Sequence, residues 1–254
     1  MAKKTNPHLL FIISTCLLSA GWLMKSFPLL IFTGFAPLFA IMDQVKEKKS
    51  FWNFFELILL ALCTSLFCAY LFDTNYIVPV LIQGILFTLS FVGYSYARRQ
   101  LGSWLVNFFI ILFWLGIEYL LLKLSWPKSI LFLADAVQLK TEWLRWTPFT
   151  GYLGASCWIL LCNFILYMAL LRSEKINPAL VGLYLLLLAG PIIYSYTLPE
   201  HTISRSDMIS LYNHVERTDS AYTKRGEYIP RTAAFLAGLI LIFAIIKQKP
   251  ERND

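Results

Sequence analysis

Residues 151–171 read GYLGASCWILLCNFILYMALL and contain no charged side chain. A helix rises about 1.5 Å per residue, so a run of this length reaches across the roughly 30 Å hydrocarbon core of a lipid bilayer. An open strand edge would leave backbone groups unpaired in lipid, whereas a helix pairs them internally. The stretch therefore predicts a transmembrane helix.

Similar apolar runs recur along the whole chain. Together they predict spanning helices at about 8–24, 27–43, 51–72, 76–97, 101–122, 151–171, 178–197 and 231–247. Hydrophobic residues make up 58% of the sequence and charged residues only 15%, where a soluble domain carries about a quarter. A chain of 254 residues is too short to hide so much apolar surface from water. We predict an all-α integral membrane protein with about eight transmembrane helices in a single polytopic domain, residues 1–254.

The basic residues indicate the orientation of the helices. Lysine and arginine concentrate in cytoplasmic loops, and an N-terminus placed in the cytoplasm puts twelve of the 22 basic residues on that side. These are Lys3, Lys4, Lys46, Lys48, Lys49, Arg98, Arg99, Arg172, Lys175, Lys247, Lys249 and Arg252. We therefore expect both termini in the cytoplasm. No cleavage site follows the first apolar run, so we expect it to be an uncleaved span.

Several function classes find no support in the sequence. The basic residues lie at the ends of apolar runs and form no stripe that could follow a nucleic acid, so we expect no nucleic-acid partner. All five cysteines fall inside apolar runs, as small core residues do. The polar residues show no metal-ligand spacing, phosphate-binding loop or hydrolase motif, so we expect no metal, no cofactor and no catalytic residue.

Two segments are too long and polar to be simple turns. Residues 123–150 combine three tryptophans with the apolar stretch 130–136, which suits an amphipathic loop on the outer face at the level of the lipid headgroups. Residues 198–230 form a second outer loop, rich in polar side chains. Pro28 and Pro37 in the second predicted span, and Gly190–Pro191 in the seventh, predict kinks or irregular backbone turned away from lipid.

Five side chains are candidates for a lipid- or partner-binding site. A carboxylate inside a membrane helix, such as Glu118, usually faces a cavity or a partner. Asn163 is a buried amide, for which a hydrogen bond between helices is the simplest role. The rings of Trp126, Trp143 and Trp146 are expected at the membrane interface, where tryptophan is enriched.

Several motifs resemble those of the apolipoprotein N-acyltransferases, which transfer an acyl chain from phospholipid to the N-terminus of a lipoprotein. The longest is LRWTPFTGYLGASCWILLCN at residues 144–163, with a tryptophan-bearing loop, a G-x-x-G turn and a helix with Trp and Asn. The others are W-x-x-x-E ending at Glu118, Trp126-Pro127, Phe35-Ala-Pro-Leu-Phe39 and Arg225-Gly-Glu-Tyr-Ile-Pro-Arg231. The resemblance implies a multi-pass protein of the bacterial inner (cytoplasmic) membrane.

The chain departs from that family at the catalytic domain. The family carries a nitrilase-like domain with a Glu-Lys-Cys triad before its last helix, and here residues 198–230 stand in that place without a cysteine. Three hypotheses follow. The chain is a non-catalytic module that binds membrane phospholipid, lipoprotein or a partner protein at the outer leaflet; or it is an acyltransferase that works with a separate catalytic subunit; or it is an unrelated transporter or assembly subunit.

Overall fold

The computed structural model describes residues 5–24, 28–44, 48–101, 108–123, 130–200 and 228–247, and within these ranges the chain is helical and has no strand. The longer helices are α1 (Pro7–Leu23), α4 (Lys48–Ala69), α5 (Ile77–Leu101), α6 (Phe109–Lys123), α8 (Leu153–Leu170), α9 (Pro178–Tyr196) and α12 (Tyr228–Ile246). The shorter ones are η1 (Pro28–Leu30), α2 (Ile31–Gly34), α3 (Ala36–Asp43), η2 (Thr74–Tyr76), η4 (Leu133–Val137), η5 (Thr141–Trp143) and α7 (Thr147–Thr150). The predicted all-α class is confirmed for this part of the chain.

Five of these helical stretches are long and apolar enough to cross a membrane: α4, η2 with α5, α8, α9 and α12. The other three predicted spans also coincide with helices, but α1 has 17 residues and α6 has 15 in the described ranges. These five helices support a multi-pass membrane protein. The count of eight spans and the side on which the termini lie stay predictions.

The predicted span 27–43 is not one continuous helix. It is divided into η1, α2 and α3, and Pro37 stands in the first turn of α3, where its missing N–H does no harm. The neighbouring helix α1 satisfies one backbone group at the break, because the Ser14 hydroxyl donates to the Gly34 carbonyl at 2.6 Å. Irregular backbone inside a membrane bundle requires such partners.

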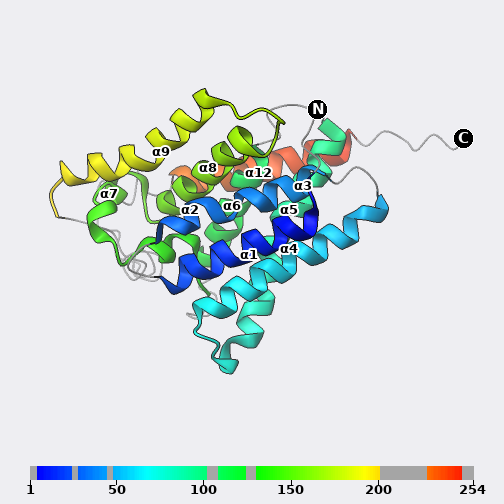
Figure 1. Ribbon diagram of the computed structural model, residues 1–254, viewed down its shortest axis with the longest axis horizontal. Helices are drawn as coiled ribbons and strands as arrows, with labels where there is room; N and C mark the ends of the chain where they lie inside the picture. The colour runs from blue at the N-terminus through cyan, green and yellow to red at the C-terminus, as the bar shows by residue number, and fades with distance from the viewer. Residues whose placement is uncertain are drawn as a thin grey trace, which may run out of the picture.

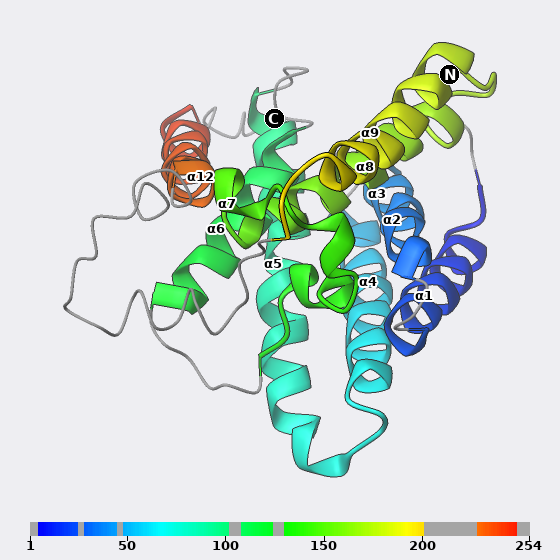
Figure 2. The same ribbon diagram turned by 90° about the vertical axis from the view of Figure 1, so that its left-hand side faces the viewer.

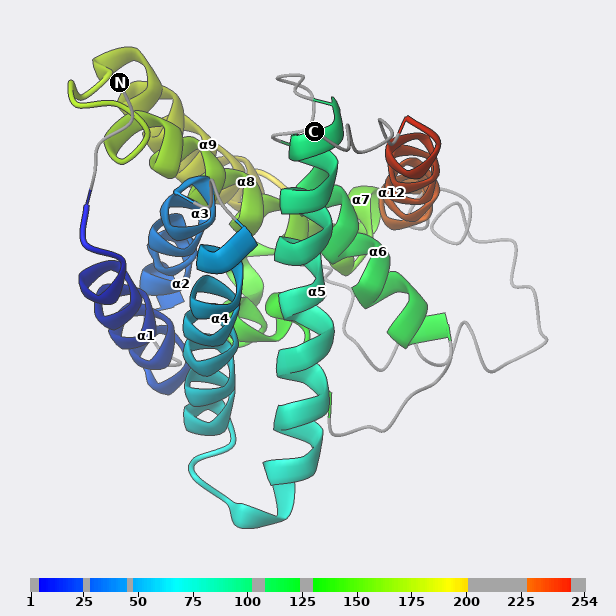
Figure 3. The ribbon, with the colours of Figure 1, turned by 90° about the vertical axis from the view of Figure 1, so that its right-hand side faces the viewer.

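The helices lie around a central α8. Of the five membrane-length stretches, α8 is the most buried and α9 the least. Figure 2 shows α9 and α12 on different sides of the molecule, with α6 and α7 between them. The helices α4 and α5 form a hairpin whose turn extends beyond its neighbours (Figure 3). In Figure 1, α1 begins and α12 ends toward the same side of the molecule.

The segment predicted as an outer amphipathic loop is described from residue 130 onward. Residues 130–150 contain the three short turns η4, η5 and α7. The apolar side chains of η4 and of Ile130 and Phe132 are buried against the bundle. Of the second predicted loop, only residues 198–200 and 228–230 are described, and α12 already begins at Tyr228.

Candidate functional site: an apolar groove and its polar frame

The N-terminus of η4 enters the bundle, and side chains from neighbouring helices hold it there. Glu118 of α6 is fully buried and accepts hydrogen bonds from the Leu133 N–H at 2.8 Å and the Trp114 indole N–H at 3.1 Å. Ser156 of α8 accepts from the Ala134 N–H at 3.0 Å. The first N–H groups of a helical turn have no acceptor inside the turn. Glu118 and Ser156 supply the acceptors for the Leu133 and Ala134 N–H groups. Glu118 thus braces an irregular segment.

Two further side chains complete this bracing. Gln83 of α5 pairs with both backbone groups of Leu131: its Nε2 donates to the carbonyl, and its Oε1 accepts from the N–H at 3.2 Å. Asp135 accepts from the Phe132 N–H at 2.7 Å and from the Tyr152 hydroxyl. Each of the four N–H groups that lead into η4 therefore has a side-chain acceptor, as buried backbone requires.

Asn163 braces the break between α2 and α3. Its Oδ1 accepts from the Phe35 N–H at 2.8 Å and the Ala36 N–H at 3.2 Å. Its Nδ2 donates to the carbonyls of Ile31 and Ile159, both at 2.9 Å. All hydrogen-bonding positions of the amide are used. The predicted role in bonding between helices is confirmed, and no capacity is left for a ligand.

The three candidate tryptophans are not equivalent. Trp126 lies outside the described residues. Trp143 is half-buried, with the Lys140 ammonium 6.0 Å from its ring centroid. Trp146 is only 8% exposed and meets Trp158 edge-on, with ring centroids 5.7 Å apart. The Trp146 ring therefore packs inside the protein, and its level in the membrane stays a prediction.

Trp146 forms part of the wall of an apolar cavity of about 540 Å³ beside α9. This α9 cavity lies between α8, α9 and the first turn of α12, with α7 at one end. It is lined by Trp146, Phe149, Thr150, Gly154, Cys157, Trp158, Leu161, Leu187, Gly190, Pro191, Tyr194 and Ile229. Its volume lies within the range of roughly 300–1,000 Å³ that is usual for ligand pockets.

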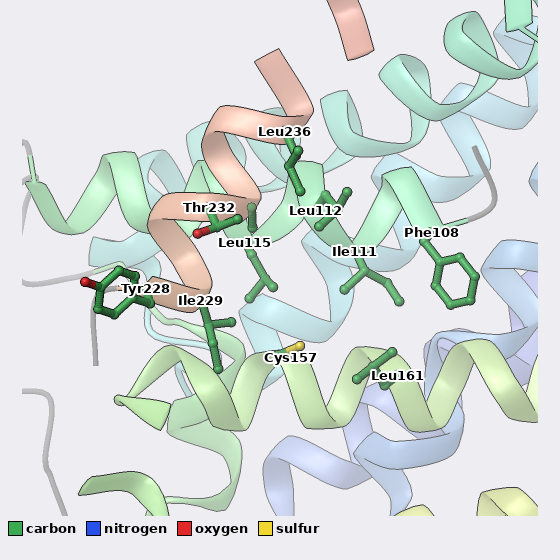
Figure 4. Close-up of a pocket in the computed structure, with 11 residues that line it drawn as sticks. Phe108, Ile111, Leu112, Leu115, Cys157, Leu161, Tyr228, Ile229, Thr232 and Leu236 are labelled. Atoms are coloured by element: carbon green, nitrogen blue, oxygen red, sulfur yellow. The ribbon is translucent and has the colours of Figure 1, made fainter. Parts of the chain in front are cut away.

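A second apolar cavity, of about 380 Å³, lies beside α12 (Figure 4). In this α12 cavity, Cys157 and Leu161 reach from α8 toward α6 and toward Tyr228, Ile229, Thr232 and Leu236 of α12. The two cavities share Cys157, Leu161 and Ile229, so they meet along one face of α8. We call them together the α8 groove.

Polar bonds hold α9 beside the groove. The Trp158 indole N–H donates to the Leu187 carbonyl at 2.7 Å. At the end of α9, the Arg145 backbone N–H donates to the Ser195 hydroxyl at 2.9 Å. Tyr184 and Ser195 are the buried residues of α9, so most of this helix is lightly packed and these bonds help to fix its position.

Sequence reasoning identified Trp146 as a site residue and missed the rest of the groove. Glu118, Asn163 and Trp143 do not line the groove. Pro191 was the available signal: it marks the helix that forms one wall, although α9 stays helical through it. Among the described residues, no group of three or more His, Cys, Asp or Glu side chains could hold a metal ion.

Comparisons of this chain with protein-family models, curated proteins and solved structures find no match.

Proposed function

We propose that this chain is a membrane module that holds an acyl chain of a membrane lipid in the α8 groove. The observation that carries the proposal is the apolar lining shared by the two cavities along α8. In a bilayer, a concave apolar surface without partner atoms loses dispersion contacts, so a lipid chain is the natural occupant. Residues of both α9 and α12 line the α9 cavity, so the proposed route for lipid from the bilayer runs between these two helices.

The resemblance to the apolipoprotein N-acyltransferases fits this proposal. A non-catalytic module related to the membrane portion of the apolipoprotein N-acyltransferases would use such a groove for phospholipid or for a lipid-modified peptide. The bacterial inner membrane and the outer-leaflet level of Trp146 belong to the same proposal. What supports them is the order of the motifs along the sequence and the position of Trp146 in the groove wall.

Two glycines of α9 provide a matched test. A Cβ built on Gly190 or on Gly182 meets no atom within 4 Å, so each position accepts a side chain without a clash. Gly190 lines the α9 cavity, whereas Gly182 does not. Leucine at position 190 would occupy groove space, and leucine at position 182 would change the same helix by the same amount elsewhere.

The experiment is native mass spectrometry of protein purified in mild detergent. We expect wild type and Gly182→Leu to retain bound lipid and Gly190→Leu to lose most of it. Equal retention by Gly190→Leu and Gly182→Leu would contradict the proposal. A separate protein that stays bound in stoichiometric amount would instead favour the split-acyltransferase hypothesis.

A further inference from the structure

Arg145 places a positive charge just past one end of the α9 cavity. It immediately precedes Trp146, which lines the cavity, and its backbone N–H binds Ser195, which follows the cavity residue Tyr194. Its guanidinium reaches beyond the end of α9, where it donates to the Leu198 carbonyl at 3.2 Å. A lipid chain in the cavity would therefore have its headgroup near this cation.

The acid that pairs with Arg145 is weakly held. Arg145 Nη2 and Glu200 Oε1 are 3.0 Å apart, and the Glu200 side chain is 86% exposed while that of Arg145 is 15% exposed. An ion pair with so exposed a partner contributes little stability. The guanidinium thus has a fixed position, whereas its carboxylate partner is replaceable by another anion.

Apolar contacts alone cannot select a lipid in a bilayer. An acyl chain that moves from the bilayer into an apolar groove leaves one hydrocarbon environment for another, so the hydrophobic effect favours neither. Selection must come from polar groups at the headgroup. A planar guanidinium with five donors suits phosphate, which accepts two parallel hydrogen bonds from it.

We propose that Arg145 binds the phosphate of a phospholipid whose acyl chain occupies the α8 groove, and that this phosphate displaces the carboxylate of Glu200. This inference rests on the proposed function and adds the headgroup class and the residue that recognises it. The lipid is a phosphodiester, and a neutral diacylglycerol with the same chains binds more weakly.

The test measures lipid affinity of the full-length protein by native mass spectrometry with dioleoylphosphatidylglycerol, dioleoylphosphatidylethanolamine and dioleoylglycerol. In wild type, we expect both phospholipids to bind at least about tenfold more tightly than dioleoylglycerol, the usual gain from charge-assisted hydrogen bonds. Arg145→Gln should abolish that difference. Glu200→Gln should strengthen phospholipid binding up to about fivefold, because it removes the competing carboxylate. Lys175→Gln, at the opposite end of α8, controls for net charge.

Several outcomes would overturn the inference. Equal binding of all three lipids to wild type is one, and unchanged phospholipid affinity in a folded Arg145→Gln protein is another. If Arg145→Gln does not fold, the Glu200→Gln variant is the test. Phospholipid affinity that does not rise in Glu200→Gln would then overturn the inference. Displacement of Glu200 by inorganic phosphate without any preference among the lipids would assign the site to a free anion. Gly190→Leu separates the two proposals, since it should weaken all three lipids whatever Arg145 does.

Discussion

The indole N–H of Trp158 in α8 donates to the backbone carbonyl of Leu187 in α9 at 2.7 Å. Leu187 is four residues before Pro191, and a proline has no N–H with which to occupy the carbonyl one turn earlier. The side chain of α8 thus uses the acceptor that Pro191 leaves open inside α9. This bond fixes α9 against α8 at the level of the α9 cavity, whose lining includes all three residues.

A double-mutant cycle tests this relationship. Trp158→Phe should lower the free energy of unfolding by about 1 kcal/mol, as the loss of one bond between membrane helices does. In the Pro191→Ala background, the alanine N–H can occupy the Leu187 carbonyl, so Trp158→Phe should cost less. The coupling is measured by SDS titration in mixed micelles. Strict additivity of the two changes would show that the indole does not depend on the proline.

Asn163 should be among the most sensitive positions in the bundle. Asn163→Leu keeps a similar volume but leaves the N–H groups of Phe35 and Ala36 without their acceptor. We expect the free energy of unfolding to fall by about 3 kcal/mol or more, since each unsatisfied buried group costs about 1–3 kcal/mol. Asn75→Leu, exposed in the turn between α4 and α5, is the control and should change little. Similar losses for both variants would argue against the bracing role.

Glu118 should act through its oxygens as acceptors. Glu118→Gln retains an acceptor for the Leu133 and Trp114 N–H groups, so we expect stability within about 1 kcal/mol of wild type. Glu118→Leu removes it, and hydrogen exchange at Leu133 and its neighbours should accelerate. Lipid retention should be unchanged in Glu118→Gln. A loss of lipid in that variant would show that the carboxylate contributes to binding directly.

The two tryptophans of residues 141–146 should respond differently to truncation. Trp146→Ala empties a buried site and should cost about 3 kcal/mol or more in unfolding free energy. Trp143→Ala removes a half-buried ring and should cost less than about 1 kcal/mol. The indole Nε1 of Trp146 is buried without an acceptor among the described residues, so Trp146→Phe should be tolerated far better than Trp146→Ala. Equal losses for Trp143→Ala and Trp146→Ala would contradict the burial that separates them.

Sequence reasoning succeeded where hydropathy and side-chain chemistry act locally. The charge-free run that contains Asn163 is a central helix, and the amide bonds between helices as buried amides in membranes do. Local patterns could not show that η4 is drawn into the bundle. That depends on acceptors from Gln83, Glu118 and Ser156, which only the packing of α5, α6 and α8 brings together.

The groove could not be predicted from the sequence for a related reason. Its lining residues are apolar and are spaced like those of any lipid-facing helix, so no pattern marks Cys157 or Ile229 as cavity residues. The cavities exist because α9 and α12 pack against different parts of the bundle and leave one face of α8 uncovered. Pro191 drew attention to α9, which stays helical through this residue while the Trp158 indole satisfies the freed Leu187 carbonyl.

Photocrosslinking from inside the bilayer tests lipid occupancy of the α8 groove most directly. Protein in nanodiscs would be irradiated with a phospholipid that carries a diazirine in its acyl chain, and the labelled peptides identified by mass spectrometry. We predict that the label falls on residues 154–161 of α8, the stretch that lines the groove. This label should be lost in Gly190→Leu and kept in Gly182→Leu. Label confined to outward-facing residues such as Ile242 and Ile246, equal in all three proteins, would contradict the account.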